Sequence, residues 1–122
     1  MTEIGNIADY VSGRIVVVRL DFAKSRPWLI LGHYDLDTGG RRLFLGGLTT
    51  KTIFDRNGLY IPPACNPGHP PSTIGSMYRF LTIGGGFGFP RLVDTHRPKV
   101  PHDLVVKARA RLISDLEGLL DE

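Results

Sequence analysis

The sequence predicts a mainly β domain of the α+β class, a small and strongly bent β-barrel of about five to six strands with a C-terminal helix. Two β-type runs, 15–18 and 28–31, are separated by a short connection, and residues 76–83 alternate polar and apolar side chains. Apolar residues also recur at helical spacing from Leu104 to Leu120. Strands of modest length followed by one amphipathic helix indicate a small sheet closed on itself.

Composition predicts one soluble domain spanning residues 1–122, because a chain of 122 residues closes a single core. Hydrophobic residues make up 42% and charged residues 22% of the chain, and no apolar run approaches the roughly 20 residues of a membrane span. The acidic start, MTEIGNIADY, does not resemble a secretory signal. A single cysteine, Cys65, forms no internal disulfide, which favours a reducing cytoplasm.

Charge is distributed unevenly along the chain. Residues 1–102 carry 12 of the 15 Lys/Arg and 7 of the 12 Asp/Glu, a net charge of +5, whereas residues 103–122 have a net charge of −2. A small basic body is compatible with a polyanionic partner such as RNA or DNA, although many basic proteins bind neither.

The first half of the chain predicts a short helical segment and three strands. Residues 1–12 have apolar residues at helix-like spacing, and strands are expected at 14–22 and 27–34. Residues 35–40, DLDTGG, contain the Asp, Thr and Gly residues of a hairpin turn, so a third strand is expected at 42–50.

The second half alternates turn-rich loops with strands and ends in the helix. We expect a turn at 57–58, a short strand at 59–61 and a proline-dense surface loop at 62–71. The last long strand is expected at 76–83. It is followed by a glycine-rich loop at 84–90, a strand-like run at 91–93 and a helix at about 101–120. Pro101 and Asp103 suit the first turn of that helix. Its apolar stripe is expected to be buried.

Arg26 is the most conspicuous polar residue of the early strands. It lies in the connection 21–26 and directly precedes Pro27. Proline holds the preceding residue in an extended conformation and so limits the directions in which the guanidinium can point. The sequence therefore predicts a positioned cation at the mouth of a strand.

Two other constellations have a stronger structural interpretation than a functional one. His33, Asp35 and Asp37 alternate, as metal ligands on one face of a strand would, but alternating polar residues before a turn are typical of a solvated strand end, and we predict no metal. Cys65 and His69 suggest a thiol–imidazole pair, yet no residue in their proline-rich loop orients the thiol, so nucleophilic catalysis is not expected.

Three further stretches leave alternatives open. Thr49-Thr50-Lys51-Thr52 combines hydroxyls and a cation that bind phosphate oxygens, but threonines also simply favour strands. The glycines of loop 84–90 precede a strand-like run and no helix, so a loop exposing Phe87 and Phe89 is expected in place of a phosphate cradle. The helix cations Lys107, Arg109 and Arg111 face either a nucleic acid or solvent.

Parts of the chain resemble the MazF/PemK family of toxin ribonucleases. Val16-Val17-Val18-x-Leu20-Asp21-x4-Arg26-Pro27-x-Leu29-Ile30-Leu31 is similar to the first strand, loop and "R-P-A-L-V-L" segment of that family. Leu48-Thr49-Thr50-Lys51 resembles its "I-T-S" segment, and Arg91-Leu92 with the terminal helix resembles its closing region. Arg14 stands where an acidic residue is usual, and loop 22–25 is shorter than the substrate-covering loop of the family.

This resemblance implies an SH3-like barrel that acts as a metal-independent endoribonuclease on single-stranded RNA without a cofactor. It implies Arg26 and Thr49 as the catalytic pair, with Arg26 stabilising charge on the phosphorane formed by 2′-OH attack and Thr49 holding a non-bridging oxygen. Asp21 is the candidate proton acceptor, and an ion pair with Arg26 is the alternative role of its carboxylate. Expected to bind RNA are Arg14, Lys24, Thr50, Lys51 and Arg79.

The resemblance also implies two protein partners, a second copy of the chain and an antitoxin. A homodimer is expected independently, because a barrel this small would leave its aliphatic strands and the Phe87/Phe89 loop poorly covered. The alternative function is a non-catalytic SH3-like binding module that inhibits a protein or nucleoprotein partner, since one fold hosts unrelated functions.

Overall fold

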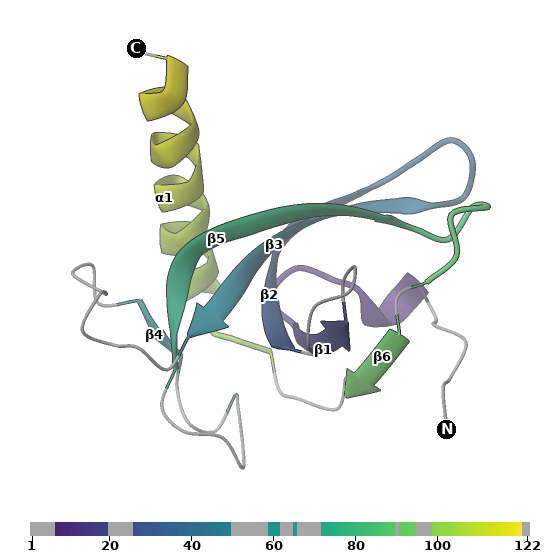
Figure 1. Ribbon diagram of the computed structural model, residues 1–122, viewed down its shortest axis with the longest axis horizontal. Coiled ribbons are helices and arrows are strands. Elements are labelled where there is room, and N and C mark those ends of the chain that lie inside the picture. The colour runs from purple at the N-terminus through teal and green to yellow at the C-terminus, as the bar shows by residue number, and fades with distance from the viewer. Residues whose placement is uncertain are drawn as a thin grey trace.

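The computed structural model describes residues 7–19, 26–49, 59–61, 65, 72–89, 91–94 and 99–120, which form a sheet and a helix (Figure 1). The elements are η1 (Ile7–Asp9), β1 (Ile15–Arg19), β2 (Arg26–Asp35), β3 (Arg41–Thr49), β4 (Tyr60–Ile61), β5 (Ser72–Ile83), β6 (Arg91–Asp94) and α1 (His102–Leu120). The six strands form one antiparallel sheet in the order β4-β5-β3-β2-β1-β6. The mainly β class and the C-terminal helix are therefore confirmed.

The sheet is open, and it is strongly curved. Register shifts interrupt the ladders at Val17/Val18, Ile30/Gly32 and Gly46/Leu48. Each such irregularity bends the strand that contains it and increases the local twist. Figure 1 shows the result along β5, which arches over its whole length. This strand begins at Ser72, four residues earlier than expected, because its first residues pair with both β3 and β4.

The central strands bury both faces of the sheet. Ile15, Leu29 and Leu31 belong to a cluster on the face that α1 covers, whereas the alternate residues Val16 and Ile30 belong to a cluster on the opposite face. Side chains alternate between faces along a strand, so continuous apolar runs in β1 and β2 require a cover on each side. The first cover is α1, through Val105, Ala108 and Leu112. The second is the segment around η1, through Ile7 and the fully buried Tyr10.

The helix corrects one sequence expectation. Within the part of the stripe whose side chains the structure describes, Val105, Ala108 and Leu112 are buried, whereas Ile113 and Leu116 are exposed. In Figure 1 the helix rises away from the sheet, so its last turns extend past the strands that cover its first turns. No helix in the described part of the chain is long and apolar enough to cross a membrane.

The glycine-rich loop packs against the β2–β3 turn. A Cβ at Gly85 would lie 2.5 Å from the backbone N of Gly40, and a Cβ at Gly40 would lie 2.8 Å from the carbonyl O of Ile83, so neither position accepts a side chain. Phe87 is 66% exposed, as expected. The expectation for Phe89 was wrong, because that side chain is half-buried and its ring centroid lies 5.9 Å from that of Tyr10.

Arg41 fastens the η1 segment to the sheet. Its Nε donates to Asp35 Oδ1 at 2.7 Å, and its Nη1 donates to the carbonyl oxygens of Ile7 and Tyr10, both at 3.1 Å. The Arg41 side chain is largely buried, whereas that of Asp35 is exposed. The backbone contacts of the guanidinium therefore hold the second cover of the sheet in place, beyond the surface ion pair.

Replacing Arg41 with alanine should lower the free energy of unfolding by about 2–3 kcal/mol, because buried carbonyl oxygens lose a charged donor. Asp35→Asn removes the same ion pair but leaves both backbone contacts, and exposed ion pairs contribute little, so its effect should be much smaller. Urea denaturation of the two variants measures the difference. Equal effects would show that the carbonyl contacts do not stabilise the fold.

His33 joins the residues before β1 to β2 through a hydrogen bond that needs a neutral imidazole. The backbone N of Ser12 donates to His33 Nδ1 at 3.0 Å, and Ser12 Oγ lies 2.8 Å from the same atom. An amide nitrogen only donates, so Nδ1 accepts and cannot carry a proton. Burial and the nearby Arg41 lower the pKa of His33 below its usual 6.5, helped by Arg109 and Lys99 and opposed by Asp35.

Stability should therefore fall as the pH falls below about 6.5. The folded state binds fewer protons at His33 than the unfolded chain does in that range, so acidification favours unfolding. His33→Gln should reduce this dependence in urea denaturation between about pH 7.5 and pH 5.5. The matched control, His102→Gln at the exposed start of α1, should keep the wild-type slope. An unchanged slope in His33→Gln would contradict the assignment.

Candidate functional site

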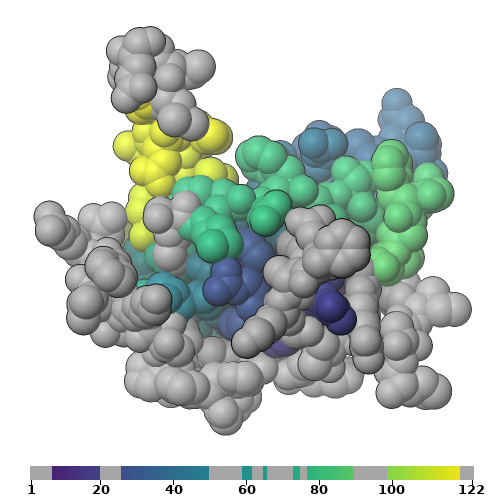
Figure 2. All heavy atoms as spheres, viewed as in Figure 1, coloured from purple at the N-terminus to yellow at the C-terminus, as the bar shows by residue number. Residues whose placement is uncertain are grey.

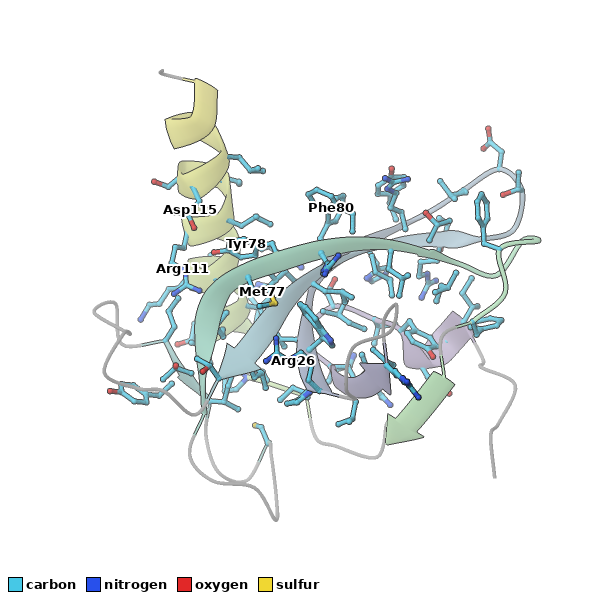
Figure 3. The ribbon with its side chains drawn as sticks, viewed as in Figure 1. Arg26, Met77, Tyr78, Phe80, Arg111 and Asp115 are labelled. Atoms are coloured by element: carbon cyan, nitrogen blue, oxygen red, sulfur yellow. The ribbon has the colours of Figure 1, made fainter. Side chains whose placement is uncertain are left out.

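Arg26 is the first residue of β2, and its exposed side chain contacts two neutral groups. Its Nη1 donates to Met77 Sδ at 3.1 Å, and its Cζ lies 5.9 Å from the ring centroid of Trp28. Figure 3 shows Arg26 and Met77 on one side of β5 and Phe80 on the other. The pairs Arg26↔Val18 and Pro27↔Val17 fix the start of β2 against β1. The guanidinium is therefore presented from a fixed backbone.

The indole of Trp28 forms the floor beside Arg26, and a glycine makes room for it. Trp28 is only 2% exposed and pairs with Gly47 of β3. A Cβ at Gly47 would lie 3.3 Å from Cζ3 of Trp28 and 3.5 Å from Cβ of Met77. The ring can therefore approach β3 closely only because position 47 has no side chain. Within the described ranges the buried indole Nε1 has no hydrogen-bond partner.

Thr49 lies at the end of β3, the strand next to the one that Arg26 begins. The β2–β3 ladder ends at the pair Trp28–Gly47, so Arg26 and Thr49 each lie two residues beyond that last pair. Thr49 is half-buried, and on its other side it pairs with Thr73 of β5. The hydroxyl Oγ1 of the fully buried Thr73 has no hydrogen-bond partner among the residues described.

The charge on Arg26 is not neutralised by any carboxylate within the described part of the chain. A thioether is a weak acceptor, and an indole ring attracts a cation without balancing its charge. An ion pair lies elsewhere, between Arg41 and Asp35, where the hydrogen bond from Arg41 lowers the pKa of Asp35. A forked cation that retains its charge beside an aromatic ring can bind a phosphate with two parallel hydrogen bonds.

The other predicted site residues fall into two groups. Arg79 is exposed on the same face of β5 as Met77, opposite Leu45 of β3, and Arg14 is half-buried just before β1. The remaining predicted residues, Asp21, Lys24, Thr50 and Lys51, lie outside the described residues. The structure thus brings Arg26 and Thr49 onto neighbouring strand ends and places Arg79 on the adjacent strand.

Met77 and Trp28 were missed as site residues by the sequence analysis, because both types usually belong to the core. Trp28 is indeed buried, but Met77 is exposed and accepts the hydrogen bond from Arg26. The available signal was the Gly46-Gly47 pair in a predicted strand, since glycine inside a strand marks a close approach of another group.

The helix cations, in contrast, prove to be largely structural. Arg111 donates from Nη2 to the carbonyl O of Ile74 at 2.7 Å and from Nε to Tyr78 Oη at 3.1 Å, and Tyr78 Oη lies 3.1 Å from Asp115 Oδ2 (Figure 3). Burial raises the pKa of Tyr78, opposed by Arg111 and supported by Asp115. Arg109 Nε donates to the carbonyl O of Leu31. These two arginines attach α1 to β5 and β2.

The structure describes one of the two constellations given a structural interpretation, and of the other it describes Cys65 alone, because His69 lies outside the described residues. No group of three or more His, Cys, Asp or Glu residues that could hold a metal ion occurs in the ranges that the structure describes. Cys65 is buried with Leu59 and Ile61 in the cluster beneath α1, and its Sγ lies 3.6 Å from the carbonyl O of Lys99. The thiol therefore packs as a core residue, although its loop was expected to lie on the surface.

No protein-family model matches this chain, and no curated protein matches it. The candidate site consequently rests on the geometry of Arg26, Trp28, Met77 and Thr49.

Gly47→Val should displace the Trp28 ring, because the added methyl groups would occupy the space against which the indole packs. Trp28 is the single tryptophan of the chain, so its emission reports on this site alone and should shift to longer wavelength as the ring meets water. Gly118→Ala is the control, since no atom lies within 4 Å of a Cβ at Gly118. Unchanged emission in Gly47→Val would contradict the role of Gly47.

Proposed function

We propose that the chain is a toxin-type, metal-independent endoribonuclease similar to the MazF/PemK family. In this proposal it cleaves single-stranded RNA in the cytoplasm by attack of a ribose 2′-OH on the adjacent phosphate. The curved sheet would correspond to an SH3-like barrel, the active protein would be a homodimer, and an antitoxin protein would cover the RNA site.

The observation that carries the proposal is the environment of Arg26. Within the described residues, its exposed guanidinium contacts the sulfur of Met77 and the indole ring of Trp28. Neither group balances its positive charge, which is therefore available to bind a phosphate. Attack of the 2′-OH places a second negative charge on the phosphorane, and a forked, positioned cation stabilises that charge more than it stabilises the substrate. Because arginine keeps its proton, it is unsuited to act as the base but suited to this role.

Other residues would supply the remaining parts of the reaction. Thr49, at the end of the strand next to Arg26, would donate its hydroxyl to a non-bridging phosphate oxygen. Asp21 is the proposed acceptor of the 2′-OH proton. The proton acquired by the leaving 5′-oxygen would come from Arg26 or water, so the reaction would end in a 2′,3′-cyclic phosphate and a free 5′-hydroxyl.

The RNA strand would extend from this point along the exposed face of β5. Arg79 lies two residues from Met77 on that face, which suits a second phosphate, and the exposed Met77 side chain offers an apolar, polarisable surface to a base. Arg14, Lys24, Thr50 and Lys51 are proposed as further backbone contacts. Such contacts bind without reading sequence and weaken with added salt.

A second candidate function is a non-catalytic binding module with an SH3-like fold that blocks a protein or nucleoprotein partner. The specific observation in its favour is Phe87, an aromatic side chain exposed at the tip of the loop after β5. Exposed aromatic residues are enriched at binding hot spots. Catalysis separates this function from the first.

Purified protein should cut single-stranded RNA in EDTA, and Arg26→Ala should slow cleavage about a hundredfold or more. Losing one preorganised donor to a developing anion costs roughly 3 kcal/mol of transition-state stabilisation. Arg26→Lys keeps the charge but loses the fork, so it should recover little of that rate. Single-turnover cleavage of a labelled oligonucleotide measures the rates, and mass spectrometry identifies the cyclic phosphate.

Lys107→Ala removes an exposed cation from α1 and is the control that should cleave as fast as wild type. Circular dichroism should show that all variants fold, because an exposed arginine contributes little to stability. Absence of cleavage by the wild-type protein, or equal rates for wild type and Arg26→Ala, would remove the ribonuclease proposal and leave the binding module.

A further inference from the structure

One side of α1 presents an apolar seam that the sheet does not cover. Val106, Ile113 and Leu116 are 46%, 54% and 42% exposed, although each is a large aliphatic residue. Together with Arg109 they follow the spacing of three, four and three residues that is typical of a seam between two paired helices. In Figure 2 the helix stands above the sheet beside β5, and none of these three aliphatic residues belongs to the buried clusters of the core.

The seam borders an open apolar groove of about 320 Å³ between α1 and the sheet. Its lining comprises Leu31, Gly32, Phe44, Phe80, Arg109, Leu112, Ile113 and Leu116. Phe80 is 51% exposed, and its ring meets that of Phe44 edge to face with 5.1 Å between centroids. Among the described lining residues, Arg109 is the one that carries a charge. Exposed aromatic and aliphatic side chains gathered on one surface mark a site of protein contact.

We infer that this surface binds the α1 helix of a second copy of the chain, antiparallel, with Ile113 of both copies meeting at a two-fold axis. Seam and groove lie side by side on one molecule, so the helix of each copy can fill the groove of the other, as a two-fold interface requires. This interface rests on the homodimer included in the proposed function and gives that homodimer a location.

Charge complementarity supports the antiparallel direction and a second copy as the partner. With Ile113 at the axis, residues four positions before and after it face each other, so Arg109 meets Glu117 of the second copy twice in the dimer. A parallel pair would set Arg109 against Arg109 and Glu117 against Glu117, and like charges facing each other oppose association. Residues 103–122 have a net charge of −2 and residues 1–102 one of +5, which also favours contact between the helix of one copy and the body of the other.

Analytical ultracentrifugation should give twice the chain mass of 13.5 kDa at about 100 μM protein. Ile113→Glu places two carboxylates together at the axis, so it should weaken the dimer at least about a hundredfold and yield monomer. Ser114→Glu, one residue away and exposed off the seam, is the matched control and should remain dimeric. A monomeric wild type, or a dimer unaffected by Ile113→Glu, would overturn the inference.

Disulfide trapping tests the direction of the helices in a Cys65→Ala background. Ile113→Cys should form a covalent dimer under mild oxidation, because the two introduced thiols meet at the axis. Val106→Cys should not, because antiparallel helices separate the two Val106 positions. Crosslinking of Val106→Cys, or none with Ile113→Cys, would overturn the arrangement. The Ile113→Glu substitution lies away from Arg26. The particle mass from ultracentrifugation therefore tests the dimer, while the cleavage assay of Arg26→Ala tests the proposed reaction separately.

Discussion

The fold depends on covering both sides of a sheet whose central strands are apolar on both faces. Val16, Val18 and Ile30 would meet water if the η1 segment were released, just as Ile15 and Leu29 would if α1 were released. Arginines attach both of these covering segments through hydrogen bonds to backbone carbonyl oxygens. Arg41 binds carbonyl groups of the η1 segment, and Arg109 and Arg111 of α1 bind carbonyl groups of the sheet. Charged donors to carbonyl oxygens are directional, so they add orientation to the undirected attraction between apolar surfaces.

The succession of strands along the chain and the terminal helix followed from local signals in the sequence. The runs 15–18 and 28–31, the DLDTGG turn and the helical stripe each specify structure through neighbouring residues, and each has its element in the structure. The extent of burial along α1 did not follow from them, because Ile113 and Leu116 fit the stripe as well as Leu112 does. What exposes them is where the sheet ends relative to the helix, a tertiary property that periodicity does not contain.

The candidate site was partly accessible from sequence for a similar reason. Arg26 was identified from its own neighbour, Pro27. The register of β2 against β3 near Arg26 depends on the irregularity at Ile30/Gly32, which the hairpin turn does not specify. The contact of Arg26 with Met77 could not be derived, since β5 is far away in sequence and Met77 comes close to β2 where Gly47 permits close packing. Arg41 was missed because an arginine in a strand carries no sign of the carbonyl groups that it will meet.

The contact between Gly40 and Gly85 also matters for the loop that carries Phe87. Two backbones touch there with no side chain between them, and further hydrogen bonds close the loop, from Phe87 N to the carbonyl O of Gly84 at 2.9 Å and from Gly84 N to that of Gly88 at 2.7 Å. The backbone that supports the exposed ring is therefore already ordered before any partner arrives. Contacts made by Phe87 would thus lose little conformational entropy, and that saving raises the affinity available from a single aromatic side chain.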